Sequence, residues 1–122
     1  MRLRMELFVQ DMDASIAFYT TMLGFELTRR SEDYASLRRG TVIIGLGPIE
    51  KLRSSGPAVG VGVEIVLELD DVPALVAVHE HCRAAGIVVE ALQPRPWGLQ
   101  DFRVSDPDGY YLRITHGNAA AQ

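Results

Sequence analysis

The sequence predicts an α+β fold of two tandem βαβββ modules, whose mixed sheets curve around a trough and carry their helices on the outer face. Three observations support this prediction. The chain has 122 residues, 48% of them hydrophobic, which suits one small globular domain with its own core. An order of strand, helix and three strands occurs twice. The last two strands flank Asp106-Pro107-Asp108-Gly109, which is typical of a hairpin turn.

The first module starts with an amphipathic strand and a capped helix. Met5, Leu7 and Val9 alternate along one strand face, which is the pattern of a half-buried β-strand. Asp11 stands at the N-cap position, where an aspartate can accept a hydrogen bond from the first helical turn. The helical pattern ends at Gly24, which suits the left-handed conformation after the last turn, and a second strand follows.

The second module repeats these signals in the same order. Ile65, Leu67 and Leu69 share a strand face, Asp71 takes the N-cap position and Gly86 ends the helix. Two unrelated βα units could agree by chance, but the recurrence of the aspartate and the glycines in one order favours a repeat. We expect one domain over 1–122, made of a first module at 1–53, a linker at 54–60, a second module at 61–116 and a flexible tail at 117–122.

Strand alternation predicts which side chains face away from the helices. Gly40 and Gly109 each precede the last strand of a module, and their correspondence places Ile44 at the position of Arg113. A mixture of aromatic, aliphatic and charged groups on one face suits a concave binding site, although charges on a strand are often only solvated. The residues expected on this face are Arg4, Glu6, Phe8, Val42, Ile44, Leu46, Glu64, Val66, Glu68, Tyr111, Arg113 and Thr115.

Charge and cysteine content narrow the partners and the compartment. The formal net charge is −4 and there is no lysine and arginine block, which argues against a nucleic-acid partner. Cys82 is the only cysteine, so an intrachain disulfide and a thiolate-clustered zinc site are excluded. Residues 1–7 lack the apolar core of a signal peptide, and no stretch has the length of a membrane span. We expect a cytoplasmic protein with a small-molecule ligand and no membrane partner.

Several motifs support a family resemblance. They are the Val9-x-Asp11 entry to a helix that holds Phe18-Tyr19, then Leu23-Gly24-Phe25, and finally Trp97-Gly98 before Asp106-Pro107-Asp108-Gly109. With the paired modules, they resemble the vicinal oxygen chelate superfamily over residues 3 to 116. This superfamily contains glyoxalase I, extradiol dioxygenases, fosfomycin-modifying enzymes and bleomycin-resistance proteins. The resemblance implies the fold and a homodimer, and its motifs are specific to the fold rather than to an activity.

The resemblance also implies where a metal would be bound. Metal-dependent members carry His, Glu or Gln ligands on the inner face of the first, fourth, fifth and eighth strands. The corresponding positions here are Arg4, Ile44, Glu64 and Arg113. Glu64 alone could bind a metal, because a protonated guanidinium donates hydrogen bonds and accepts none. A shift of one residue on the fourth strand would bring Ile43 or Gly45, which are no better. We expect no cofactor, with a divalent metal at Glu64 as the minor alternative.

Other potential metal ligands are expected to have different roles. His79 and His81 are two residues apart on a helix and so lie on different faces, while His116 points away from the side that holds Arg113. Each is expected to be a solvated or packing side chain. An all-oxygen site for a hard ion stays open as an alternative. Its ligands would be Glu6, Glu64 and Glu68.

Two features point to a ligand site. Convergence of the strands would place Glu64 between Arg4 and Arg113, in an ion-pair cluster that either joins the modules or contacts a ligand. Trp97 follows the stiff segment Pro94-Arg95-Pro96 and is either a stacking surface or a core residue. The expected ligand-binding residues are Arg4, Glu6, Phe8, Ile44, Glu64, Glu68, Trp97, Phe102, Tyr111 and Arg113, with Glu64 also the candidate catalytic base.

Four functions are compatible with these residues. The first is metal-free binding of a small organic molecule, of the antibiotic-sequestration type. The second is a metal-dependent lyase, isomerase or dioxygenase of the same superfamily. The third is a metal-free enzyme in which Glu64 is a general base and Arg4 or Arg113 stabilises an oxyanion. The fourth is a regulatory or assembly module without a ligand.

Overall fold

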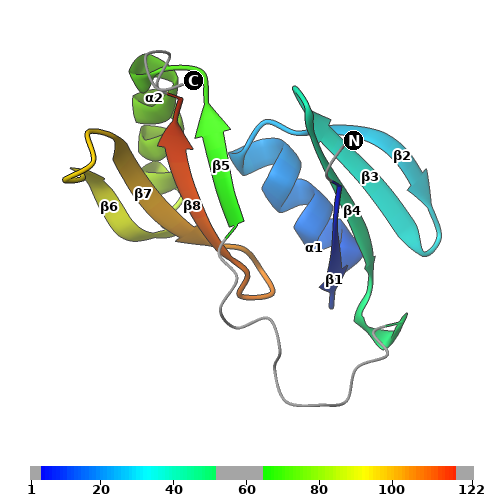
Figure 1. Cartoon of the computed structure of the whole chain (residues 1–122). Coiled ribbons are helices and arrows are strands. Elements are labelled where there is room, and N and C mark those ends of the chain that lie inside the picture. Colours follow the sequence, from blue (N-terminus) through cyan, green and yellow to red (C-terminus); the bar gives the residue numbers. More distant parts are fainter. Residues whose placement is uncertain (1–3, 52–64, 118–122) are drawn as a thin grey trace. The chain divides into compact units, whose positions relative to one another are not determined.

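The computed structural model describes residues 4–51 and 65–117 of the chain. The chain divides into two compact units, Met1–Val59 and Gly60–Gln122. Each unit has one four-stranded mixed sheet with a helix packed on one face, as Figure 1 shows. The predicted α+β fold of two tandem βαβββ modules is therefore confirmed. The predicted linker at 54–60 and most of the predicted tail lie outside the described residues.

The first unit follows the predicted order of elements. Its sheet has the strand order β1-β4-β3-β2, in which β1 is parallel to β4 and the other neighbours are antiparallel. The elements are β1 (Met5–Val9), α1 (Met12–Ala17), a π-helical turn (Phe18–Met22), β2 (Glu26–Ser31), β3 (Tyr34–Arg39), β4 (Val42–Pro48) and a short 3₁₀ helix (Ile49–Lys51).

The second unit has the same topology. Its sheet order is β5-β8-β7-β6, with β5 parallel to β8 and the other neighbours antiparallel. The elements are β5 (Ile65–Leu69), α2 (Val72–Ala84), β6 (Val88–Pro94), β7 (Gln100–Ser105) and β8 (Tyr111–His116). No helix among the described residues is long and apolar enough to cross a membrane.

The helix signals occur where the sequence predicted them. The Asp11 side chain accepts a hydrogen bond of 3.0 Å from the backbone N–H three residues on, and Asp71 accepts the equivalent bond of 2.9 Å. Gly24 has φ +71° and Gly86 has φ +73°, a left-handed conformation that L side chains rarely adopt. Each module therefore begins and ends its helix by the same physical means.

The turn between β7 and β8 is held by Asp106. Its Oδ1 accepts hydrogen bonds from the backbone N–H groups of Asp108 at 2.9 Å and Tyr110 at 2.8 Å. The Asp106 N–H also donates to the Tyr110 carbonyl at 3.0 Å, and Gly109 has φ +87°. The predicted hairpin is confirmed, and Asp106 is buried because its oxygen replaces water as the acceptor of these N–H groups.

Each helix covers an apolar core. In the first unit the Tyr19 ring makes edge contacts with Phe18, at 5.1 Å between centroids, and with Phe25, at 5.9 Å. In the second unit α2 contributes Leu75 and Cys82, both fully buried. Burial raises the pKa of the Cys82 thiol to about 11. Cys82 is thus a core residue.

The structure corrects the predicted face of Ile44. Ile44 pairs with Met5 in the parallel β1–β4 ladder, and paired residues share a face, so Ile44 lies on the helix side with 1% of its surface exposed. Its counterpart in the second unit is Leu112, which pairs with Ile65. Ile44 is the fourth residue after Gly40, but Leu112 is the third after Gly109. This difference of one residue reverses the face, as it does for Val42 and Leu46.

Phe102 is also placed differently from the prediction. It pairs with Ile114, is fully buried and packs its ring on that of His79 in α2, with 5.0 Å between the centroids. Phe102 is therefore a core residue on the helix side of β7 rather than part of a ligand-contacting surface. The physical reason is the strand period of two, which sends Asp101 and Arg103 to the opposite face.

Candidate functional site

Each sheet has one face opposite its helix, which we call its open face. In both sheets the register aligns one residue from every strand in a row across this face. The row of the first sheet consists of Glu6 in β1, Gly45 in β4, Ser36 in β3 and Arg29 in β2. The equivalent row of the second sheet consists of Val66 in β5, Arg113 in β8, Arg103 in β7 and Glu90 in β6. The same positions therefore carry different chemistry in the two modules.

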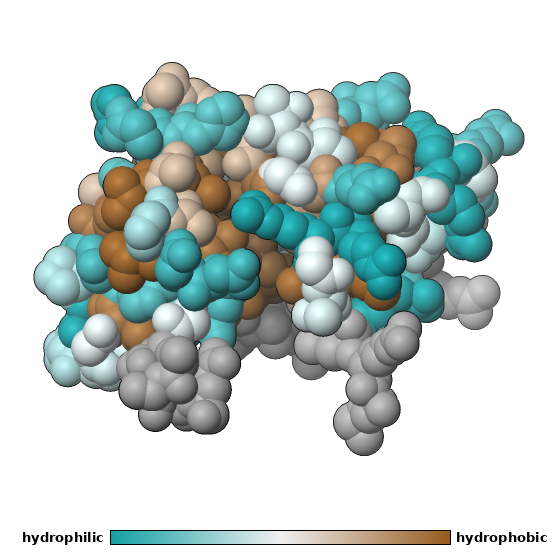
Figure 2. Space-filling view, turned by 90° about the horizontal axis from the view of Figure 1, so that it is seen from above, coloured by the Kyte–Doolittle hydropathy of each residue, from teal (hydrophilic) through white to brown (hydrophobic). Residues whose placement is uncertain are grey.

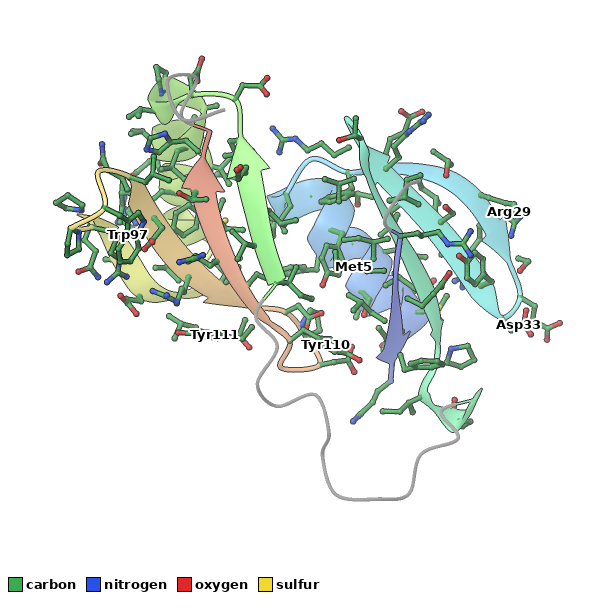
Figure 3. The ribbon with its side chains drawn as sticks, in the orientation of Figure 1. Met5, Arg29, Asp33, Trp97, Tyr110 and Tyr111 are labelled. Carbon is green, nitrogen blue, oxygen red and sulfur yellow. The ribbon has the colours of Figure 1, made fainter. Side chains whose placement is uncertain are left out.

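Glu6 is the central hydrogen-bond acceptor in the first row. Its Oε1 accepts a bond of 3.1 Å from the Tyr34 hydroxyl and lies 3.0 Å from Arg4 Nε. The Arg29 guanidinium carbon lies 5.3 Å from the centre of the Tyr34 ring (Figure 3 labels Arg29). Burial raises the pKa of the Tyr34 hydroxyl, and so does the neighbouring Glu6 carboxylate. The Tyr34 hydroxyl therefore stays protonated at neutral pH and acts as the donor in its hydrogen bond to Glu6.

Gly45 makes room for this arrangement. A Cβ atom on Gly45 would lie 2.1 Å from Glu6 Oε2 and 2.3 Å from the Tyr34 hydroxyl oxygen, far inside van der Waals contact. The φ of Gly45 is not positive, so backbone conformation does not demand glycine here. Glycine is required here because the side chains of Glu6 and Tyr34 approach each other over Gly45 on the open face.

In the second sheet, two arginines and two acidic residues form an ion-pair cluster. Arg95 Nε donates to Asp101 Oδ1 at 2.8 Å, and Arg95 Nη2 donates to Glu90 Oε1. Arg103 Nη1 lies 3.3 Å from Glu90 Oε2 and 3.7 Å from Asp101 Oδ1. Hydrogen bonding to Arg95 lowers the pKa of the Glu90 carboxyl below its usual range. These four residues are the arginine–carboxylate cluster.

Two aromatic side chains of the second unit are exposed. Trp97, in the loop between β6 and β7, has 58% of its surface exposed, so its alternative interpretation as a core residue is wrong. Tyr111, at the start of β8, is also exposed, and the Arg103 guanidinium carbon lies 5.9 Å from its ring centre. Both are labelled in Figure 3. Figure 2 shows exposed hydrophobic side chains among hydrophilic ones on the face it views.

The remaining expected site residues differ in exposure. Phe8 is half-buried and its ring lies over Gly47, while Glu68 is exposed on β5. Arg113 is half-buried on the open face next to Arg103. Glu64, the candidate base, lies outside the described residues. The structure thus joins Arg4 to Glu6 within the first unit, and it groups Arg113 with Tyr111 near Arg103 in the second.

Several residues of these groups were not predicted as site residues. The alternation of polar and apolar residues in Gln100–Ser105 could have indicated Asp101 and Arg103. Tyr34 gave no comparable local signal, because its contact with Glu6 depends on strand pairing. The residues missed in this way are Arg29, Tyr34, Gly45, Glu90, Arg95, Asp101 and Arg103.

Three of the four expected metal positions carry side chains that do not fit a divalent cation, and the fourth, Glu64, lies outside the described residues. Arg4 and Arg113 are cations that donate hydrogen bonds, and the fourth-strand position on the open face is Gly45, which has no side chain. Within the parts of the chain that the structure describes, no three His, Cys, Asp or Glu side chains are grouped as metal ligands.

Two histidines of the second unit use their ring nitrogens to hold the backbone. His79 Nε2 accepts a hydrogen bond of 3.2 Å from the Leu92 N–H, and His116 Nε2 accepts one of 3.1 Å from the Gln100 N–H. The other ring nitrogen of His116 donates to the carbonyl of Gly117 at 2.9 Å. His79 and His116 therefore pack within the second unit and bind its backbone.

The family follows from the whole chain rather than from these side chains. The model of the Glyoxalase/Bleomycin resistance protein/Dioxygenase superfamily matches residues 3–114. The chain belongs to this superfamily. No curated protein sequence matches it significantly.

Three solved structures are similar to this protein over almost the whole chain. A bleomycin resistance determinant encoded on the transposon Tn5 is 25% identical, with a TM-score of 0.72, covering 96% of this chain and 98% of that one. TioX from Micromonospora sp. ML1 is 24% identical with a TM-score of 0.78, covering 95% and 98%. Lactoylglutathione lyase from Agrobacterium tumefaciens is 20% identical with a TM-score of 0.76, covering 94% and 92%. The last two similarities concern the fold.

Proposed function

We propose that this protein binds a small organic molecule through open-face residues and without a metal ion, as an antibiotic-sequestration protein does. The observation that carries the proposal is the chemistry at the expected ligand positions. Arg4, Gly45 and Arg113 cannot supply the carboxylate, imidazole or amide ligands that a divalent cation needs.

The second unit offers groups suited to an organic ligand on its open face and in the loop between β6 and β7. Tyr111 and Trp97 present exposed aromatic surface, which can stack on a planar ring. Arg103 and Arg113 are neighbours across β7 and β8, and guanidinium groups bind carboxylates or phosphates in a bidentate manner. A few polar groups beside apolar surface are the usual composition of a small-molecule site.

The comparison with the Tn5 bleomycin resistance determinant is consistent with this proposal. It is 25% identical to the chain and is covered almost completely. That protein is described as a bleomycin resistance determinant, so a role in antibiotic resistance occurs on this fold. The metal-dependent alternative has no comparable support from the donor groups of the described residues.

The proposal is tested by a thermal-shift screen of small molecules on chelator-treated protein. A ligand that binds only the folded state raises the melting temperature in a concentration-dependent way. Candidate ligands include planar aromatic molecules with and without an anionic group. We expect at least one class to stabilise the protein in the presence of chelator, with binding confirmed by calorimetry.

Matched variants locate the site. Trp97→Ala and Arg103→Gln are expected to weaken binding at least tenfold, whereas Arg83→Gln is expected to leave it unchanged. Arg83 is a suitable control because it forms an exposed ion pair with Glu80 on α2, in the same unit. Stabilisation that appears only when a divalent cation is added would contradict the proposal and favour the metal-dependent alternative.

A further inference from the structure

Backbone hydrogen bonds of Arg95 close the loop that carries Trp97. The Arg95 N–H donates to the Leu99 carbonyl at 2.7 Å, and the Gly98 N–H donates to the Arg95 carbonyl at 3.0 Å. Gly98 has φ +93°, which L side chains rarely adopt, so the turn depends on glycine here. Prolines on both sides of Arg95 restrict the backbone further. These features define a short loop between β6 and β7.

The Arg95 side chain fastens this loop to both neighbouring strands. Its Nε donates to Asp101 in β7, and its Nη2 donates to Glu90 in β6. Asp101 has 1% of its surface exposed, and a buried carboxylate is stable when arginines satisfy it. Gln93 Nε2 donates to Glu90 Oε1 at 2.7 Å and so fixes the second acceptor. One guanidinium therefore joins the loop to two strands.

The Trp97 side chain makes few contacts with the rest of the protein. It is largely exposed, and its ring makes no stacking contact with another aromatic ring in the described parts of the chain. An indole in this situation takes its position from the backbone that carries it. Its orientation therefore depends on how rigidly the neighbouring Arg95 is held.

We propose that Arg95 is a positioning residue, which holds the Trp97 loop in one conformation through Glu90 and Asp101 before any ligand binds. Arg103 contacts the same two carboxylates, so the loop and the open-face row of the second sheet are parts of one connected cluster. A preorganised aromatic group binds a ligand with a smaller loss of conformational entropy. The importance of this rigidity for binding rests on the proposed function, whereas the rigidity itself does not.

The single tryptophan of the chain allows a direct test, because all indole fluorescence comes from Trp97. Time-resolved fluorescence anisotropy separates fast local motion from the tumbling of the whole protein. In the unaltered protein we expect a small fast component. In Arg95→Gln we expect its amplitude to rise at least twofold, and in Arg95→Lys to an intermediate value, because an ammonium cannot bridge both carboxylates as a planar guanidinium does.

Arg83→Gln is the matched control, since it removes an arginine that donates to Glu80 within the same unit. Its fast component is expected to equal that of the unaltered protein, while circular dichroism checks that each variant is folded. An unchanged amplitude in folded Arg95→Gln would overturn the proposal. If Arg95→Gln does not fold, an unchanged amplitude in Arg95→Lys overturns it instead.

The test is independent of ligand discovery. Failure of the small-molecule screen with increased motion in Arg95→Gln would reject the proposed function and keep the positioning role. A stabilising ligand with unchanged motion in Arg95→Gln would keep the proposed function and reject the positioning role. When a planar ligand from the screen is available, Arg95→Gln is expected to weaken its binding at least threefold, and Arg95→Lys to recover part of the loss.

Discussion

Replacing Asp106 with alanine removes the acceptor that holds the turn between β7 and β8. The Asp106 Oδ1 atom accepts two backbone N–H groups, from Asp108 at 2.9 Å and from Tyr110 at 2.8 Å. In the alanine variant these donors lose their partner in a site where Asp106 has 5% of its surface exposed. The backbone bonds between Asp106 and Tyr110 and between Gly109 and Asp106 remain available. The loss is therefore confined to the side chain.

The magnitude follows from the number of bonds. A hydrogen bond to a charged acceptor contributes about 1.5 kcal/mol at the lower end of its range, so two such bonds correspond to about 3 kcal/mol of unfolding free energy. Asp106→Asn keeps a side-chain oxygen at the same position but removes the charge. We expect Asp106→Asn to lose about 1 kcal/mol, well below the cost of the alanine variant.

The assay is urea unfolding followed by circular dichroism and by Trp97 fluorescence, which reports on the same unit. Free energies come from linear extrapolation, and slopes that agree among the variants show that the same structure unfolds. A cost below about 0.5 kcal/mol for Asp106→Ala, or equal costs for the two variants, would show that the Asp106 carboxylate does not hold the turn.

Experiments on three further residues test other parts of the structure. Gly45→Ala is expected to displace the side chains of Glu6 and Tyr34 and so to lower the pKa of Tyr34 towards its ordinary value. Absorbance titration measures this pKa, and an unchanged value would contradict the close approach of these two side chains to Gly45. Because alanine also restricts the unfolded chain, its net effect on stability should stay within about 1 kcal/mol.

Cys82, with its pKa raised to about 11, should resist thiol reagents at pH 8 until urea unfolds the protein. The raised pKa keeps the folded thiol protonated while the unfolded thiol ionises, so stability should fall as pH rises above about 9. Rapid native labelling at pH 8 would contradict its burial. Phe102→Ala should cost about 3 to 5 kcal/mol in urea unfolding, as expected for a core aromatic residue; a cost near zero would indicate a surface position.

Strand alternation predicted the faces of β1, β5 and β8 because charged and apolar residues alternate there. It could not do so for β4, where Val42 to Leu46 is apolar on both faces and only the count from Gly40 remained. The equivalent strand position is the fourth residue after Gly40 in β4 but the third after Gly109 in β8, and a shift of one residue exchanges the faces of a strand. Phe102 is different, because polar and apolar residues alternate along β7 and this pattern places Phe102 on the helix side.

The arginine–carboxylate cluster shows what local patterns cannot supply. Glu90 pairs with Arg103 because the β6–β7 ladder contains a register shift between Val88 and Glu90. The side chain of Arg95 then reaches back to both strands. Such contacts depend on long-range strand pairing and on register shifts that no residue pattern in this chain predicts. The capping residues and hairpin turns were predicted because their hydrogen bonds lie within a few residues of sequence.

We propose that this member of the Glyoxalase/Bleomycin resistance protein/Dioxygenase superfamily binds its ligand without a metal ion. The most direct measurement is the metal content of the purified protein, determined by plasma mass spectrometry after equilibration with manganese, nickel, zinc and iron salts and removal of unbound ions. We predict far less than one equivalent of any divalent metal per chain, because Arg4, Gly45 and Arg113 stand where ligands would be needed. One tightly bound equivalent per chain would contradict metal-free binding.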